Sequence, residues 1–301
     1  MRILILGAGG ALGSTIGRHL ERETDWNVAR VTRTTLTENG IEHAFNASTR
    51  ADWTTLFSNP QTRPDTVINA AAMTNVDACE SNRKHAWTDN VDLVIRANDA
   101  CRAYHVPLIH FSTDYIFDGK HGPYAENGIP NPINYYGKTK LAAENECRRH
   151  GNDVTIVRTM WLYGGSSIRP SYIEWLTTEL TAGRTIRIAH DEIGSPTLCE
   201  DVAAGIRHII EIGAKGLVNL AGPEIISRLD IAYIVANWVG ADPELIIPVL
   251  SRDLNRPAAR PLQSGLLTLR AQALLHWHAT PLVQGLIWLR TVRNREAIAK
   301  R

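Results

Sequence analysis

The sequence has few cysteines, and they follow no metal or redox spacing. Its 301 residues include only Cys79, Cys101, Cys147 and Cys199, and no two of them form a C-x-x-C pair. This distribution excludes a zinc ribbon and a dithiol motif. A chain of this length buries a full core without disulfides, so we expect four reduced, buried thiols.

The sequence also lacks a long apolar run and an excess of one charge. The 32 basic and 31 acidic residues nearly cancel, and no apolar run approaches the about 20 residues of a membrane span. Residues 3–6 pass directly into glycines, which indicates a strand and a turn rather than a secretory signal. We therefore expect a cytoplasmic protein without a nucleic-acid or membrane partner.

The eleven histidines show no metal-ligand spacing. His105 and His110 flank a predicted strand, where a structural or solvent-facing role is expected. The sequence predicts no metal site.

Short apolar runs alternate with longer amphipathic ones through the first two thirds of the chain. The predicted strands are 2–6, 27–32, 66–70, 106–112 and 154–158, with 41–45 as a weaker one. The main predicted helices are 11–22, 85–104 and 134–150. This alternation is typical of a parallel sheet covered on both faces with right-handed crossovers. The predicted fold is therefore α/β, with a doubly wound parallel sheet of the Rossmann type.

The alternation loosens after residue 164, where loops rich in Gly, Ser and Pro separate helices and short strands. This change indicates a second, smaller mixed α/β domain. We predict a dinucleotide-binding domain at 1–160, with 196–222 returning to it. Residues 161–195 and 223–301 are predicted to form the substrate domain.

Three glycines follow the first predicted strand and open the first predicted helix. Gly7, Gly10 and Gly13 form G-x-x-G-x-x-G. Glycine lets a chain turn sharply and approach a pyrophosphate, and the helix N-terminus then offers N–H groups to the phosphates. In this strand–turn–helix context the pattern predicts a dinucleotide site; the alternative is a purely structural turn.

The residues after the second predicted strand indicate which dinucleotide binds. NAD sites place an acidic residue there, but no carboxylate stands between Asp25 and Glu38. Arg33 instead offers a guanidinium that suits the 2′-phosphate of NADP. The alternative is that Arg33 is an ordinary solvated side chain.

Tyr136 and Lys140 lie four residues apart in a predicted helix and therefore share one face. A free tyrosine has a pKa near about 10, and a nearby ammonium lowers it toward neutral pH. This pair is thus predicted to be a proton donor and its activating cation; the alternative is a surface pair. Thr113 follows the predicted strand 106–112, where ligands of open α/β sheets bind, and its hydroxyl suits a reacting carbonyl. Together the three indicate a hydride-transfer site.

Several ordered motifs surround these residues. They are STDYIFDG at 112–119, PYAE at 123–126, YGKTK at 136–140, NAAA at 69–72 with Thr74, Val76, Asp77 and Glu80, RTMWLYG at 158–164, GSPT at 194–197, and Arg260, Pro261 and Ser264. With them the chain resembles the dTDP-4-dehydrorhamnose reductase family of extended short-chain dehydrogenases, from residue 1 to about 270.

The resemblance implies reduction by NADP(H) of the C4 keto group of a nucleotide-activated deoxysugar, with dTDP-L-rhamnose or a close analogue as product. The implied catalytic residues are Thr113, Tyr136 and Lys140. The cofactor residues are Gly7, Gly10, Ala11, Leu12, Gly13, Arg33, Asn46, Ala70, Ala71, Ala72, Tyr136 and Lys140. The implied substrate residues are Thr74, Val76, Tyr115 and Trp161. Core packing is the alternative for Trp161, Thr74 and Val76.

The sequence departs from the family pattern mainly on the implied substrate side. Met160, Glu192, Gln263 and Leu267 replace the usual residues there, and Asn46 stands where many relatives place an aspartate. The sugar therefore stays open, and a reductase of another nucleotide sugar is an alternative. A second alternative is a non-catalytic subunit like the beta chain of methionine adenosyltransferase. We expect a monomer or homodimer.

Overall fold

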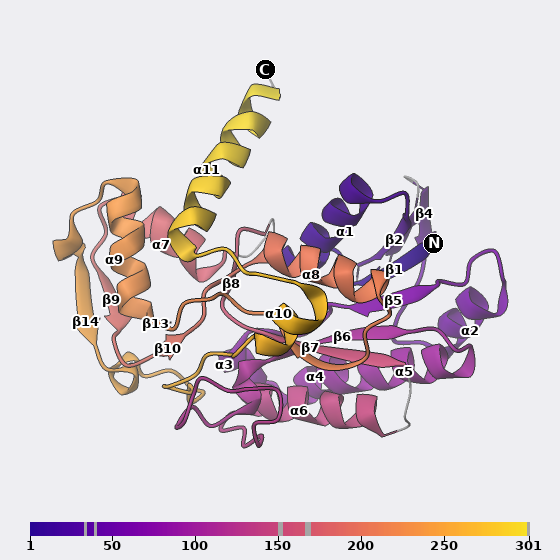
Figure 1. The fold of residues 1–301 in the computed structure, drawn as a ribbon. Helices are drawn as coiled ribbons and strands as arrows, with labels where there is room; N and C mark the ends of the chain where they lie inside the picture. Colours follow the sequence, from indigo (N-terminus) through magenta and orange to yellow (C-terminus); the bar gives the residue numbers. More distant parts are fainter. Residues whose placement is uncertain (33–34, 39–40, 150–152, 166–169, 300–301) are drawn as a thin grey trace.

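A twisted sheet forms the centre of the protein (Figure 1). The computed structural model describes residues 1–32, 35–38, 41–149, 153–165 and 170–299. Within them the main sheet has the strand order β12-β7-β6-β5-β1-β2-β3-β4. Its strands are β1 (Arg2–Leu6), β2 (Asn27–Val31), β3 (Thr35–Glu38), β4 (Ile41–Ala44), β5 (Thr66–Asn69), β6 (Leu108–Thr113), β7 (Val154–Thr159) and β12 (Gly216–Asn219). Six of them run parallel, β12, β7, β6, β5, β1 and β2, and all of these except β12 lie at predicted strands.

The doubly wound parallel sheet is extended at one edge by two antiparallel strands. β3 pairs antiparallel with β2, where Val31 faces Leu36, and β4 pairs antiparallel with β3. The connection from β2 to β3 is too short for a crossover helix, so the chain turns straight back. β3 was not predicted, because Leu36 is the only apolar residue in it. Arg33 lies outside the described residues.

Helices cover both faces of the sheet, and the strand side chains divide between them. Ile3 and Ile5 pack with α1 (Ala11–Glu23), α8 (Cys199–Glu211) and α10 (Leu269–Leu275). Leu4 and Leu6 pack on the other face with α2 (Arg50–Ser58), α5 (Leu93–Ala103) and α6 (Tyr135–Arg148). This alternation follows from the two-residue period of a strand. Figure 1 shows the two helical layers above and below the sheet.

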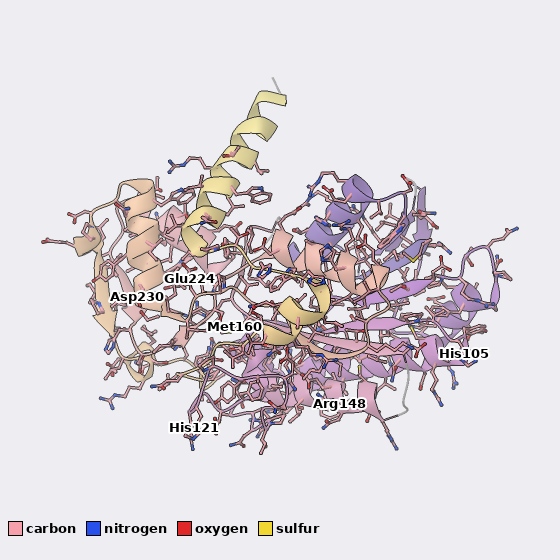
Figure 2. The ribbon with its side chains drawn as sticks, in the orientation of Figure 1. His105, His121, Arg148, Met160, Glu224 and Asp230 are labelled. Atoms are coloured by element: carbon pink, nitrogen blue, oxygen red, sulfur yellow. The ribbon has the colours of Figure 1, made fainter. Side chains whose placement is uncertain are left out.

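A smaller unit with its own core lies beside the carboxyl ends of the parallel strands (Figure 1). It contains α7 (Tyr172–Thr181), β9 (Ile186–Ala189), α9 (Arg228–Val239), β14 (Ile246–Val249) and α11 (Leu282–Ala299). Leu176, Ile188 and Val235 are among its buried residues. Met160 lies where this unit meets the sheet (Figure 2). The short pairs β8 (Leu162–Tyr163) with β11 (Thr197–Leu198), and β10 (Ile193–Gly194) with β13 (Ile226–Ser227), connect the two parts.

The helix predicted at 85–104 is interrupted. The chain forms α3 (Val76–Ser81) and α4 (Arg83–Trp87), then a π-helical segment, η1 (Thr88–Asp92), and only then α5. In η1 the buried Asn90 bonds to both backbone groups of Met73, at 2.7 and 3.2 Å, and to Thr139 Oγ1 at 3.0 Å. π-bulges in helices are frequent at functional sites, and here the hydrogen bonds of Asn90 hold the loop after β5 against α6.

A buried ion pair joins α6 to the sheet. The Arg158 guanidinium, on β7, donates two hydrogen bonds of 2.9 Å to the Glu144 carboxylate, and both side chains are almost fully buried. Burial alone would raise the pKa of Glu144, but Arg158 holds it below its ordinary value. Removing Arg158 leaves the buried Glu144 carboxylate with the more exposed Arg148 as its remaining charged partner, at 2.6 Å, so that much of the buried charge loses its compensation.

We expect Arg158→Met to lower the free energy of unfolding by about 3–5 kcal/mol, measured by urea denaturation. Lys215→Met is the matched control, because it breaks an exposed pair with Asp153 and should cost about 1 kcal/mol at most. Equal losses in the two variants would contradict this account of α6.

Among the described residues, no helix is long and apolar enough to cross a membrane, and no group of His, Cys, Asp and Glu side chains is arranged to hold a metal ion.

Candidate functional site

The glycine turn lies between β1 and α1. Gly7 has φ +78°, and a Cβ atom there would lie 2.6 Å from Ala71 N, so a side chain is excluded by both conformation and space. The N–H groups of Gly7 and Ala8 donate to Val31 O, each at 3.0 Å. Gly10 is the N-cap of α1, so no N-cap side chain forms a hydrogen bond with the N–H groups of the first helical turn. The N-terminus of α1 is therefore open toward an anion.

The predicted cofactor residues near this turn differ in how far they are buried. Ala11 is half-buried, and Leu12 and Gly13 are buried at the start of α1. Ala70, Ala71 and Ala72 follow β5, are all half-buried, and face Gly7 through Ala71. Asn46 is exposed, and its side-chain oxygen accepts two bonds from Ser48, at 2.6 and 2.9 Å. The structure thus brings the glycines and alanines together, with Asn46 in a turn after β4.

The three predicted catalytic residues come from two neighbouring elements. Thr113 is the last residue of β6, and Tyr136 and Lys140 lie on α6; all three are nearly buried. Asn134 caps α6 through Gly137 N at 2.8 Å, and the Glu80 carboxylate accepts from Tyr135 N at 2.8 Å. These two bonds fix the first turn of α6, which carries the Tyr136 phenol.

Close packing holds the start of α6 against the end of β6. A Cβ atom on Gly137 would overlap the carbonyl oxygen of Tyr115, so only glycine allows this approach. The Tyr115 ring then meets the Tyr136 ring edge-on, with centroids 5.7 Å apart. Tyr115 lies in the short helix η2 (Asp114–Ile116).

The prediction that Lys140 lowers the pKa of Tyr136 is wrong in this structure. Burial raises the pKa of Tyr136 well above its ordinary value, and the hydrogen bond with Thr113 only partly opposes it. Lys140 Nζ instead donates to the backbone oxygen of Phe111 at 2.6 Å. Burial lowers the pKa of Lys140 to about 8. The ammonium therefore loses its proton as the pH rises through about 8.

Two further buried polar residues lie under this site and were not predicted to belong to it. His110 lies with its Nε2 3.5 Å from Lys140 Nζ and its Nδ1 3.3 Å from Asn69 Nδ2. Burial, and then the charge of Lys140, lower the pKa of His110 well below its ordinary value. Asp114 is buried against Thr113 and Ser264. A histidine within the predicted strand 106–112 was the sequence signal for His110, and the motif at 112–119 was the signal for Asp114.

A cavity of ≈ 370 Å³ opens beside Tyr115, between the sheet and the smaller unit. Of the four predicted substrate residues, Val76 and Tyr115 line it. Trp161 lies behind its wall, where the Arg228 guanidinium stacks 4.2 Å from the centre of the indole ring. Trp161 also has φ +42°, a strained backbone for a bulky residue. Thr74 is exposed and does not line the cavity.

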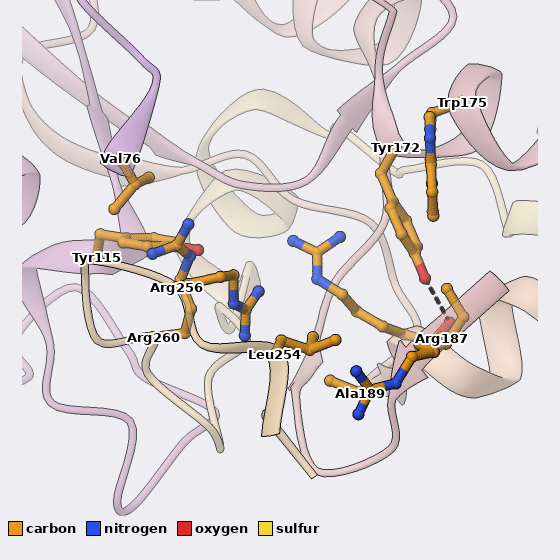
Figure 3. A pocket seen from close by; sticks show the side chains of 11 residues that line it. Val76, Tyr115, Tyr172, Trp175, Arg187, Ala189, Leu254, Arg256 and Arg260 are labelled. Atoms are coloured by element: carbon orange, nitrogen blue, oxygen red, sulfur yellow. Dashed lines mark hydrogen bonds between the residues drawn. The ribbon is translucent and has the colours of Figure 1, made fainter. Parts of the chain in front are cut away.

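Four arginines line this cavity and were not predicted: Arg187, Arg228, Arg256 and Arg260. In Figure 3, Arg256 and Arg260 lie beside Tyr115 at one end of the cavity, and Tyr172 and Trp175 lie at the other. The arginines come from β9, the start of α9 and the loop before residue 261, so sequence spacing does not reveal them. Their convergence gives the cavity a locally positive wall in a chain of almost zero net charge.

Two acidic residues hold three of these arginines in place. Glu192 is buried and contacts Arg256, and it accepts from Arg228 Nε at 3.0 Å. Burial would raise the pKa of Glu192, but Arg256 and Arg228 together hold it below its ordinary value. Asp77 accepts from both terminal nitrogens of Arg260, at 3.0 and 2.7 Å. The described residues that line or support the cavity therefore include four guanidinium groups and the carboxylates of Glu192 and Asp77.

Comparison with known proteins places this site in a family. The family model described as "RmlD substrate binding domain" matches residues 1–287. A dTDP-4-dehydrorhamnose reductase of Mycobacterium tuberculosis is 32% identical, and the match covers 88% of this chain and 84% of that protein. A dTDP-4-keto-6-deoxy-D-glucose reductase of Streptomyces niveus is 33% identical over 66% of this chain and 69% of its own length.

A solved structure agrees on the fold. The dTDP-4-dehydrorhamnose reductase of Bacillus anthracis, in complex with NADP, superposes with a TM-score of 0.86 at 24% identity, over 96% of this chain and 98% of that one. The family model extends over the glycine turn and all the residues that line the cavity, and the match with the Mycobacterium relative covers most of the sequence. The chain therefore belongs to the dTDP-4-dehydrorhamnose reductase family.

Proposed function

We propose that this protein is an NADPH-dependent reductase of the C4 keto group of a nucleotide-activated deoxysugar, dTDP-4-dehydro-L-rhamnose or a close analogue. One observation carries the proposal. The buried Thr113 and Tyr136 hydroxyls lie at the carboxyl edge of the sheet, next to a cavity with four arginines. A proton donor beside an anion-binding cavity suits a ketone that carries a diphosphate.

The glycine turn suits the pyrophosphate of the cofactor, because the space that a side chain on Gly7 would fill is closed by Ala71. We assign Ala70 to Ala72 to the facing wall, Lys140 to the nicotinamide ribose, and Arg33 to the 2′-phosphate. NADPH, when bound, supplies the hydride that reduces the keto carbon.

The chain's own residues handle the proton. Tyr136 donates its phenolic proton to the keto oxygen as the carbon is reduced, and the product is an alcohol. Thr113 holds the same oxygen by a hydrogen bond. Lys140 follows Tyr136 by one turn of α6, and we assign its ammonium to the nicotinamide ribose rather than to the phenol.

We assign the arginine cavity to the nucleotide diphosphate of the substrate. A diphosphate carries about two negative charges, which the four guanidinium groups, partly balanced by Glu192 and Asp77, are able to match. Tyr115 then faces the sugar, and Trp161 supports Arg228 from behind. The sugar lies between the cavity and Tyr136.

We also propose the two-part division of the chain at 1–160 with 196–222, and 161–195 with 223–301, except that we assign α10 to the first part, because Ala271 and Leu275 pack in its core. The pairing of β12 with β7 supports the return of the chain to the first part. The assembly is proposed to be a monomer or homodimer, which analytical ultracentrifugation decides.

We expect NADPH to bind about tenfold or more tightly than NADH, and Arg33→Ala to remove most of this preference, because a hydrogen bond to a charged group is worth about 1.5–3 kcal/mol. Dissociation constants for both cofactors measure it. Arg102→Ala, which changes an exposed arginine on α5, is the control and should keep the preference. Equal affinities of the wild type for NADPH and NADH would contradict the assignment.

A panel of 4-keto nucleotide sugars that differ in base and sugar, assayed by NADPH oxidation, tests the function. Turnover of a dTDP-4-keto-6-deoxy sugar is the expected result. Turnover of another nucleotide sugar alone would favour the second enzymatic alternative, a reductase of a different nucleotide sugar. Binding of NADPH without turnover of any sugar would favour a regulatory subunit.

A further inference from the structure

Asp114 is a buried carboxylate that the proposed mechanism does not use. It follows Thr113 directly and is 1% exposed. Its Oδ1 accepts the Thr113 hydroxyl at 3.1 Å, and its Oδ2 accepts the Ser264 hydroxyl at 2.7 Å, from a loop 150 residues farther along the chain. Both hydroxyls are themselves buried. A buried carboxylate costs stability unless pairing and hydrogen bonds compensate it, and the side-chain hydrogen bonds of Asp114 come from two neutral hydroxyls.

The hydroxyl proton of Thr113 indicates the role of Asp114. A threonine hydroxyl carries one proton, and a keto oxygen only accepts. In this structure the Tyr136 phenol and Asp114 Oδ1 both lie within hydrogen-bond reach of the Thr113 hydroxyl; its one proton goes to Asp114 Oδ1, and Thr113 Oγ1 accepts the N–H of Tyr115 at 3.3 Å. Thr113 therefore cannot donate to a keto oxygen while an ionised Asp114 takes its proton. A neutral Asp114 reverses the bond, because its own O–H donates to Thr113 Oγ1.

We propose that Asp114 is a positioning residue for the reduction, which in its neutral form turns the Thr113 proton toward the keto oxygen of the substrate. This inference deepens the proposed function, because it takes Thr113 as the residue that binds that oxygen. Ser264 holds the second carboxyl oxygen and so keeps Oδ1 aimed at Thr113.

The surroundings of Asp114 bring its pKa into a pH range in which the enzyme can be assayed. Burial raises the pKa of Asp114 to about 6, against the opposing effect of the bonds from Ser264 and Thr113. The other titratable or charged groups that interact with Asp114 are Tyr115 in η2, Tyr136 on α6 and Arg228 on α9. The neutral form of Asp114 therefore decreases as the pH rises through about 6.

The first experiment compares kcat/KM of the wild type and Asp114→Asn between pH 5 and 8. We expect the wild-type value to fall about tenfold or more as the pH rises through about 6, the scale of a lost donor to the reacting oxygen. The asparagine amide donates to Thr113 at every pH, so Asp114→Asn should show no such fall and should be faster than the wild type above pH 7. An identical fall in both proteins would overturn the proposal.

The second experiment needs no substrate. Infrared difference spectra between wild type and Asp114→Asn follow the carbonyl band of the neutral Asp114 carboxyl as a function of pH. Thr113→Val and Ser264→Ala should each raise the midpoint, because each removes a donor that stabilises the carboxylate. If the wild type reduces its sugar but the midpoint is unchanged in Thr113→Val, the role of Asp114 is overturned and the proposed function is not. Absence of turnover by the wild type would overturn the proposed function and that role together.

Discussion

Tyr136→Phe should lower kcat by about 10²–10⁴, the usual contribution of a general acid. The variant keeps the ring that packs against Tyr115 and removes only the phenolic hydroxyl. Binding of NADPH should stay within about twofold of the wild type, because the glycine turn and Lys140 are unchanged. Single-turnover rates with the identified sugar, and cofactor titration by fluorescence, measure the two effects separately.

Tyr135→Phe is the matched control, because Tyr135 is the preceding residue of the same helix and its side chain packs under the Arg83 guanidinium, 5.1 Å from the ring centre. It should turn over at the wild-type rate. Near-normal turnover of Tyr136→Phe would show that Tyr136 is only a structural residue of α6.

Lys140→Met should act on both the cofactor and the pH profile. Burial lowers the pKa of Lys140 to about 8, so the ammonium is present below pH 8 and is lost as the pH rises through that value. The wild-type rate should therefore fall above pH 8. Lys140→Met should lack this fall, bind NADPH more weakly, and lose about 10²–10³ in kcat at neutral pH, as when a preorganised charge is removed from a reacting centre.

Lys138→Met controls for the loss of a positive charge on α6, because Lys138 is exposed two residues before Lys140. It should leave both kcat and the fall above pH 8 unchanged. A fall near pH 8 that persists in Lys140→Met would assign it to another group and contradict the role given to the lysine.

The local parts of the fold follow from the sequence. Continuous apolar runs predict the parallel strands, and the spacing of Gly7, Gly10 and Gly13 predicts the turn into α1, because both depend on residues close together in the chain. Tyr136 and Lys140 are likewise related by helical periodicity alone. These features need no knowledge of the tertiary structure.

The parts that were not predicted depend on contacts between distant segments. The interruption of the predicted helix at 85–104 stems from Asn90, whose partners are Met73 and Thr139. The buried state of Asp114 depends on Ser264, and the arginine cavity depends on the meeting of separate segments. The lowered pKa of Tyr136 was a wrong prediction, because helical spacing shows that Lys140 is near but not that its ammonium bonds to Phe111.

The central claim is that a hydride passes from NADPH to C4 of a dTDP-4-keto-6-deoxy sugar at the Tyr136 site. The most direct measurement supplies NADPH that carries deuterium on the reacting carbon of the nicotinamide and examines the sugar product by NMR. The account predicts one deuterium on C4 of the product with wild type, formed about 10²–10⁴ times more slowly with Tyr136→Phe. Oxidation of the cofactor without deuterium at C4, or no reduced sugar at all, would contradict it.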